Sequence, residues 1–395
     1  MFFSTQKSSY LSQVNIAVGK GLWEHFVSLA QRLLQVQVKQ VLLSDQTTLT
    51  YLEMGKVGKP PLVFFHGLSD MKESFLPCGY YLLKDYHIIV PDLPGHGQNP
   101  KKVETTYSWD YFVKSLNEFI DLLSLGPVHL MGNSLGGALA FHLATHPTSK
   151  LASTFRSLTL VDTAGFIHES NWQLYNEMVS REGLFDFSEG QGDFEFVLSR
   201  IFHKSPRIPL AVRDFFWQKM VDEQEWNRKL CVDLSRKLIV PFKVLTAFSQ
   251  FQKEEEGGDW ENYQDMILNW RLSQVKIPTL ILWGEEDRVI PVPVAHYLHR
   301  HIGRSRLKIL PAHIHPTIYQ GPHGQTPRIA VLMQFFVVDH QRDFCLDFNS
   351  RKKCADTSPH REITALTMAR GSGMERTRIG RHGRRSYLLS LSCQL

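Results

Sequence analysis

Ser134 stands in the pentapeptide Gly132-Asn133-Ser134-Leu135-Gly136, between a run expected to form a buried strand and a run expected to form a helix. A serine on so sharp a turn presents its hydroxyl, and the residues that flank it must be small. Gly132 and Gly136 meet that requirement. The N-terminus of the following helix favours negative charge that develops near the serine. We therefore predict that Ser134 is a nucleophile.

A second turn offers backbone donors to this nucleophile. His66-Gly67-Leu68 directly follows the apolar run 62–65. We expect the backbone N–H groups of Leu68 and Leu135 to hold the oxyanion of a tetrahedral intermediate. Gly67 belongs to this loop, and we expect His66 to shape the loop without transferring protons.

A carboxylate at the end of a later strand suits the orienting acid of a catalytic triad. The segment 283–287 reads WGEED and completes the apolar run 279–283. We choose Asp287, because a rigid strand end at the carboxyl edge of a sheet can hold an imidazole in one tautomer. Asp162, which follows another expected strand, is the second candidate.

Three histidines lie beyond the acid, where the order nucleophile, acid, base places the general base. His313, His315 and His323 all follow an expected strand at 307–310, and residue types alone leave the choice open. The pair His313-x-His315 could instead bind a metal ion, but no further ligand at a suitable spacing accompanies it. We expect no metal and no cofactor.

Short apolar runs alternate with helical patterns along most of the chain. This alternation predicts an α/β fold with a mostly parallel sheet covered by helices on both faces. We expect an opening hairpin at 38–43 and 48–53 and a helix at 108–124. The buried strands are expected at 62–65, 87–90, 128–131, 158–161, 279–283 and 307–310.

The expected elements divide the chain into five parts. Residues 163–273 hold 18 aromatic side chains and few strand signals, so we expect a helical cap inserted into the core. We expect an amphipathic N-terminal region at 1–37 and a first part of the core at 38–162. The cap follows at 163–273, the second part of the core at 274–339, and a basic, disordered tail at 340–395.

Segment 14–34 places apolar residues on one helical face. Leu22, Phe26, Leu29 and Leu33 follow a 4-3-4 spacing, which predicts an amphipathic helix. We favour packing of this helix on the main domain. Docking on a membrane surface is the alternative.

Composition limits the class of protein. The 395 residues are 43% hydrophobic and 21% charged, which excludes a mainly disordered chain. The formal charge of +5 lies wholly in residues 337–395, which hold 11 Lys and Arg against 6 Asp and Glu. The start of the chain lacks the pattern of a secretory signal, and no stretch has about 18 consecutive apolar residues. We expect a cytoplasmic protein with no specific nucleic-acid partner, and peripheral contact with a membrane through residues 14–34 is the alternative location.

Four motifs in order resemble those of the α/β-hydrolase superfamily. They are the HG-x turn at 66–68, the D-x-P-G-H-G loop at 92–97, the G-x-S-x-G-G elbow at 132–137 and the W-G-x-x-D turn at 283–287. The resemblance covers about residues 40–340 and is nearest to the monoacylglycerol lipase and esterase branch, with the α/β-hydrolase domain 6 type and similar bacterial lipases.

The resemblance also favours one histidine as the base. In that family the base ends a pattern similar to L-x-x-x-G-H, and residues 310–315 match its spacing, which selects His315. Ile314 stands where the family has Gly, and Pro316 follows. His313 therefore remains the alternative base, and a catalytically weak binding protein remains an alternative function.

The resemblance implies a serine hydrolase that cleaves lipid-like carboxylic esters through an acyl-enzyme. A monoacylglycerol lipase or carboxylesterase is expected, with the aromatic-rich cap around the substrate. Similar elbows occur in carbon–carbon bond hydrolases, which are the alternative chemistry on this fold.

Overall fold

The computed structural model describes residues 2–145, 154–171, 208–235 and 268–311. Their strands form one eight-stranded sheet in the order β1-β2-β4-β3-β5-β6-β7-β8. Neighbours from β4 to β8 are parallel, whereas β2 is antiparallel to both β1 and β4. The strands are β1 Gln37–Leu42, β2 Thr48–Met54, β3 Pro61–Phe65, β4 His87–Pro91, β5 Val128–Asn133, β6 Phe155–Val161, β7 Thr279–Gly284 and β8 Ser305–Leu310.

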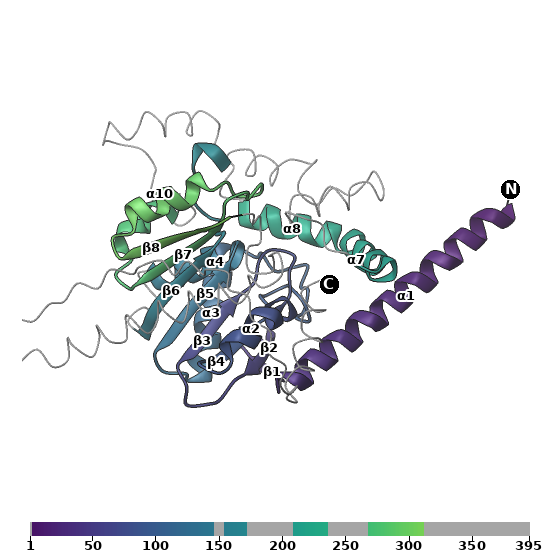
Figure 1. The fold of residues 1–395 in the computed structure, drawn as a ribbon, viewed down its shortest axis with the longest axis horizontal. Helices are drawn as coiled ribbons and strands as arrows, with labels where there is room; N and C mark the ends of the chain where they lie inside the picture. Colours follow the sequence, from purple (N-terminus) through teal and green to yellow (C-terminus); the bar gives the residue numbers. More distant parts are fainter. Residues whose placement is uncertain (1, 146–153, 172–207, 236–267, 312–395) are drawn as a thin grey trace, which may run out of the picture.

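Both faces of the sheet are buried, which explains why its strands read as continuous apolar runs. On β3, Val63 and Phe65 belong to one hydrophobic core, and Leu62 and Phe64 belong to the core on the other face. Helices of the first core and of the second lie on opposite sides of the sheet (Figure 1). The first core has α3 Trp109–Leu123, α4 Leu135–Thr145 and α10 Pro293–His301, and the second has α2 Leu76–Leu82. The expected α/β class is confirmed.

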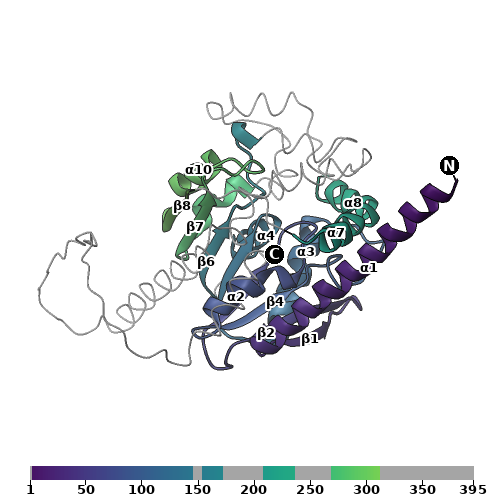
Figure 2. The same cartoon turned by 45° about the vertical axis from the view of Figure 1, so that its right-hand side comes forward.

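The N-terminal helix, α1 Phe2–Leu33, extends away from the sheet and packs against α7 Leu210–Asp222 (Figure 2). The Trp23 ring meets the Phe216 ring edge-on, with centroids 5.0 Å apart. Gly19 permits the close approach, because a Cβ there would lie 1.8 Å from the Ala211 carbonyl oxygen. Packing on α7 therefore orients α1.

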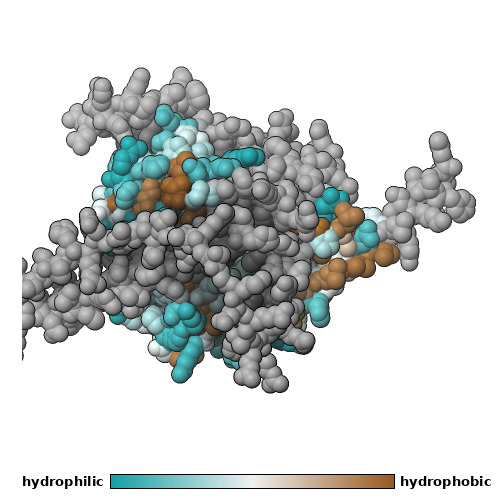
Figure 3. Space-filling view, in the orientation of Figure 1, coloured by the Kyte–Doolittle hydropathy of each residue, from teal (hydrophilic) through white to brown (hydrophobic). Residues whose placement is uncertain are grey.

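Apolar side chains of α1 remain on the surface. The exposed ones are Val14, Val18, Leu22, Leu29 and Leu33, and hydrophobic surface is visible where α1 meets α7 (Figure 3). The predicted packing of this helix is present, because α1 packs on α7 and Ala30 and Leu34 pack in the second core. The side chains of Leu22, Leu29 and Leu33, on the predicted apolar face, nevertheless stay exposed. Among the described helices, none is long and apolar enough to cross a membrane.

The described parts of the predicted cap are mostly helical. They are η3 Glu169–Asn171, α7, α8 Gln224–Ser235 and η5 Leu268–Gln274. The rest of segment 163–273, the end of the second core part and the tail lie outside the described residues. The five-part division of the chain stays a prediction.

Candidate active site

Ser134 occupies the turn between β5 and α4 with φ +52°, a left-handed conformation that is rare for a residue other than Gly. Hydrogen bonds from both sides support it. The Ser134 N–H donates to the Val161 carbonyl at 3.0 Å, and the Ser134 carbonyl accepts from the Ala164 N–H at 3.1 Å. The end of β6 thus fixes the backbone of the serine, whose side chain is half-buried.

The glycines around Ser134 are required by close backbone contacts. A Cβ on Gly132 would lie 2.1 Å from the Gly136 carbonyl oxygen, and a Cβ on Gly136 would lie 2.1 Å from the Phe65 carbonyl oxygen. Both separations are far below van der Waals contact. The predicted strand–turn–helix is present, and its two glycines let α4 begin directly against the end of β3.

The loop that follows β3 lies beside this serine. A Cβ on Gly67 would lie 3.4 Å from the Ser134 Cβ, and β3 pairs with β5 up to Phe65 and Gly132. Leu68 follows in the same loop, and Leu135 is the first residue of α4. The structure therefore gathers the predicted nucleophile and both predicted oxyanion donors at one edge of the sheet.

His66 is fully buried, and both of its ring nitrogens have backbone partners. The Leu93 N–H donates to Nε2 at 3.0 Å. Nε2 must then lack a proton, so Nδ1 carries it and donates to the Gly67 carbonyl at 2.8 Å. This arrangement fits the expectation that His66 shapes the loop.

Asp287 is held by its own turn after β7. Its Oδ1 accepts hydrogen bonds from the backbone N–H groups of Val289 and Ile290, both at 2.8 Å. The buried Trp283 closes the same turn, since its indole N–H donates to the Ile290 carbonyl at 2.8 Å. Asp287 is 6% exposed, so the turn presents a fixed, nearly buried acid at the carboxyl edge of the sheet.

Asp162 has a structural task at the same edge. It is fully buried, with φ +42°, and its Oδ1 accepts from the Gly284 N–H at 2.8 Å. This bond ties the end of β6 to the end of β7. The structure therefore brings both candidate acids to the edge that carries Ser134.

The candidate bases His313, His315 and His323 lie outside the described residues. The chain leading to them leaves β8 at Leu310, whose carbonyl accepts from the Glu285 N–H at 3.0 Å. Gly284 pairs with Leu310 in the β7–β8 register. The segment with the histidines thus starts next to the turn that carries Asp287.

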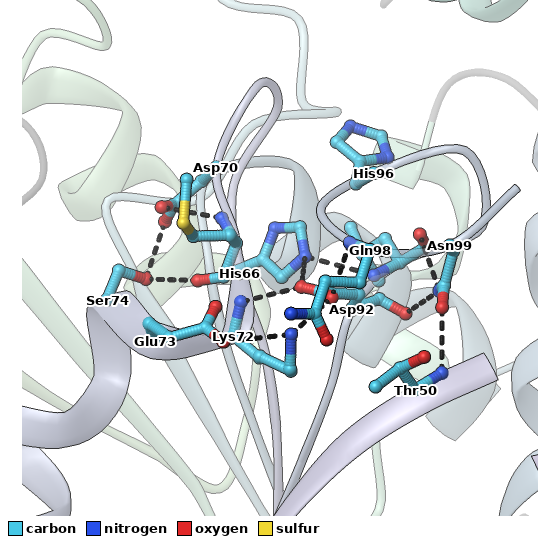
Figure 4. A network of polar contacts seen from close by, with 12 residues as sticks. Thr50, His66, Asp70, Lys72, Glu73, Ser74, Asp92, His96, Gln98 and Asn99 are labelled. Carbon is cyan, nitrogen blue, oxygen red and sulfur yellow. Dashed lines mark hydrogen bonds and ion pairs between the residues drawn. The ribbon is translucent and has the colours of Figure 1, made fainter. Parts of the chain in front are cut away.

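A buried lysine near the oxyanion loop was not predicted from the sequence. Lys72 and Asp92 are both fully buried, and the Lys72 Nζ lies 2.7 Å from Asp92 Oδ2 (Figure 4). Lys72 Nζ also lies 2.9 Å from Glu73 Oε1. Lys72-Glu73 lies in a polar loop, so its residue types predict exposure to solvent. The one sequence feature that could have indicated a buried lysine is Asp92, since a buried carboxylate needs a partner.

His96, in the loop after β4, is a second buried histidine near His66, and their ring centroids are 5.4 Å apart. Burial, followed by the neighbouring His66, lowers the pKa of His96 to about 3. Its Nδ1 contacts the Pro94 carbonyl at 2.9 Å, so the neutral ring donates there. At neutral pH His96 therefore adds no charge beside the oxyanion loop.

Helix α8 rests on the loop that follows β4. The Trp226 indole N–H donates to the Gly95 carbonyl at 2.7 Å, and Asp233 accepts from the Tyr107 N–H at 3.0 Å. The Trp226 and Tyr107 rings also meet edge-on at 5.4 Å. Part of the predicted cap is therefore anchored next to the loop that contacts His66.

The fold and the elbow geometry define a hydrolase of the α/β class. A family model described as the alpha/beta hydrolase fold matches residues 60–322, and the chain belongs to this family. The resemblance noted in the sequence is thereby confirmed.

Lipases are among the relatives of this chain. Lipase 1 of Psychrobacter immobilis is 25% identical over 69% of this chain and 76% of its own length. The monoacylglycerol lipase ABHD6 of Bos taurus is 27% identical over 82% of this chain and 87% of its own length. These relatives support an enzyme of the carboxylic ester hydrolase class.

Solved structures share the fold. A bacterial membrane phospholipase A superposes with a TM-score of 0.66 at 23% identity, covering 86% of this chain and 99% of its own. An esterase from Exiguobacterium antarcticum gives a TM-score of 0.55 at 19% identity, covering 76% and 100%. At these identities the likeness establishes the fold.

Proposed function

We propose that this protein is a serine hydrolase that cleaves lipid-like carboxylic esters, of the monoacylglycerol lipase or carboxylesterase type. The observation that carries the proposal is the left-handed Ser134 at a strand-to-helix turn, with the His66–Leu68 loop beside it. A serine on such a turn presents its hydroxyl as a nucleophile next to backbone donors.

In the proposed reaction His315 takes the proton from the Ser134 hydroxyl as its oxygen attacks the ester carbonyl. The N–H groups of Leu68 and Leu135 stabilise the oxyanion, and collapse of the tetrahedral intermediate expels the alcohol, which is protonated by His315. Water then attacks the acyl-enzyme by the same route and releases the acid. Asp287 orients the imidazole and stabilises its protonated form.

We favour Asp287 over Asp162 as the acid because of its surroundings. The turn of Asp287 adjoins the exit of β8 through the Glu285–Leu310 hydrogen bond. Asp162 lies deeper, bonded to the Gly284 N–H and fully buried. His315 is favoured over His313 because residues 310–315 match the pattern that the family resemblance implies for the base.

Two features support a lipid-like substrate at a membrane surface. The relatives include a protein named as a monoacylglycerol lipase, and α1 exposes apolar side chains beside α7. We infer that this face of α1 docks on a lipid surface as a peripheral contact. The helices of the cap would then surround the acyl chain or the alcohol.

Substrate panels test the proposal. We expect hydrolysis of p-nitrophenyl esters and monoacylglycerols by the wild-type chain and a loss of at least about a thousandfold in kcat for Ser134→Ala. Hydrolysis of a meta-cleavage product without ester hydrolysis would favour carbon–carbon chemistry. Failure to turn over either panel would favour a binding protein.

A further inference from the structure

We propose that Lys72 and Asp92 form a buried clamp that positions the oxyanion loop, which makes Lys72 a positioning residue for catalysis. This inference rests on the proposed serine hydrolase function, because the loop acts only if Leu68 binds an oxyanion. The clamp holds both ends of the loop 66–72 (Figure 4).

The direction of the Leu68 N–H depends on the carbonyl of Gly67. Both groups belong to one planar trans peptide, so they point in opposite directions. The Gly67 carbonyl accepts from His66 Nδ1 at 2.8 Å and from the Asp70 N–H at 3.4 Å. These bonds hold the Gly67 carbonyl on the side of the His66 ring. The Leu68 N–H of the same peptide therefore points away from that ring.

The first end of the loop depends on the position of the His66 ring. The ring receives the Leu93 N–H on Nε2, and Leu93 follows Asp92 directly. The backbone of Asp92 is fixed in turn, since its N–H donates to the Thr50 carbonyl at 2.9 Å and its carbonyl accepts from the Asn99 side chain at 2.7 Å. A shift of Asp92 would therefore move the ring that orients the Gly67–Leu68 peptide.

The second end of the loop is Lys72, which bonds to the Asp92 side chain twice. Its backbone N–H donates to Oδ1 at 2.8 Å, and its Nζ donates to Oδ2 at 2.7 Å. The Gln98 N–H also donates to Oδ2 at 2.9 Å. The Asp92 carboxylate thus fixes Lys72 at the end of the loop, while the Leu93 N–H fixes His66 at its beginning.

The loop between these ends carries strain that needs such support. Ser69 has φ +59° without being a glycine, which is an unfavourable conformation for an L-residue. Its hydroxyl is buried and has no hydrogen-bond partner among the described residues. The Ser69 side chain therefore does not stabilise this turn. Bonds on either side of it do: the Asp70 N–H donates to the Gly67 carbonyl, the Ser74 hydroxyl contacts Asp70, and the clamp fixes the two ends.

The test compares hydrogen exchange of the loop with ester turnover. The double variant Lys72→Met/Asp92→Asn removes both charges of the clamp, while Glu73, which is 9% exposed and pairs with Lys72 Nζ, loses its cation. We expect faster exchange in the peptide covering 66–72, unchanged exchange in 128–133, and a kcat lower by about 10- to 100-fold with KM within about threefold. The single variant Lys72→Arg, which keeps the cation, should retain most of the wild-type kcat.

Lys39→Met is the matched control, since Lys39 pairs with Glu53 on the β1–β2 hairpin; we expect wild-type exchange and turnover. Wild-type exchange of 66–72 in the double variant would overturn the clamp. Faster exchange with unchanged kcat would overturn the positioning role. If the double variant does not fold, exchange of the Lys72 amide in the wild-type chain decides, since the clamp predicts slow exchange of this hydrogen-bonded N–H, and rapid exchange would overturn the clamp.

The two readouts separate this inference from the function on which it rests. A wild-type chain that turns over no ester would refute the proposed function and with it the catalytic role of Lys72. The exchange measurement would still decide whether the clamp exists.

Discussion

At the scale of single residues, the elbow depends on contacts too close for any side chain. Gly136 faces the carbonyl oxygens of Phe65 and His66, at 2.1 and 2.5 Å from the position of an added Cβ. The Ser134 backbone is simultaneously held in a left-handed conformation. The nucleophile can therefore be disturbed without any change to its own side chain.

Gly136→Ala should lower both stability and activity. The new methyl group must push α4 away from the end of β3, and overpacking of this kind costs about 1–3 kcal/mol or more. We expect a lower thermal midpoint and a loss of at least about a hundredfold in kcat/KM. Gly21→Ala in α1 is the control, because nothing lies within 4 Å of its added Cβ. Wild-type behaviour of Gly136→Ala would contradict the geometry of the elbow.

A buried histidine on β5 predicts acid sensitivity. Burial, and then the charge of Arg156, lowers the pKa of His129 from 6.5 to about 4. Between these values the unfolded chain binds a proton that the folded chain does not, so stability falls as the pH falls from 6.5 towards 4. The loss is on the order of 3 kcal/mol.

His129→Gln should remove this part of the pH dependence. Denaturant unfolding gives the free energy of unfolding at each pH. Between pH 6.5 and pH 4 we expect this free energy to change less steeply with pH than in the wild-type chain, by about 1.4 kcal/mol per pH unit. His301→Gln, on the exposed side of α10, provides the control. Identical slopes for His129→Gln and the wild-type chain would refute this assignment.

At the scale of elements, the strands were predictable because burial on both faces gives continuous apolar runs. The run 128–131 became β5 Val128–Asn133, and 87–90 became β4 His87–Pro91. The partner of α1 was not predictable, because Trp23 and Phe216 are distant in sequence and only tertiary structure brings them together. The burial of Lys72 was missed for the same reason, since its partner Asp92 comes from the next strand end.

The exposed face of α1 predicts membrane binding. Val14, Val18 and Leu22 are 40%, 50% and 49% exposed. Replacing all three with Ser should lower partition into phosphatidylcholine and phosphatidylserine vesicles about a hundredfold, at about 1 kcal/mol per apolar side chain. Co-sedimentation measures the effect, while turnover of a water-soluble ester should stay unchanged.

The control replaces three exposed apolar residues elsewhere. Val57, Val103 and Leu122 lie on loops and on α3, and their exchange for Ser should leave vesicle binding at the wild-type level. Equal loss of vesicle binding in both triple variants, or no loss in the α1 variant, would refute the prediction that α1 binds the membrane.

At the scale of the whole molecule, contacts run without a break from the N-terminal helix to the oxyanion loop. α1 packs on α7, α7 contacts α8, and α8 holds the loop after β4 through Trp226 and Gly95. Leu93 of that loop then contacts His66. The surface expected to meet lipid and the loop expected to hold the oxyanion thus belong to one packed body.

The net charge lies outside the residues that the family model matches. The formal +5 lies in residues 337–395, whereas the family match ends at residue 322. The proposed ester chemistry therefore needs no anionic partner.

The central claim is that Ser134 is a nucleophile activated by a histidine beyond β8. Labelling with a fluorophosphonate, followed by mass spectrometry of the modified peptide, tests it most directly. We predict one adduct on Ser134, lost in His315→Ala and kept in His313→Ala. A folded wild-type chain whose Ser134 remains unlabelled would contradict the account.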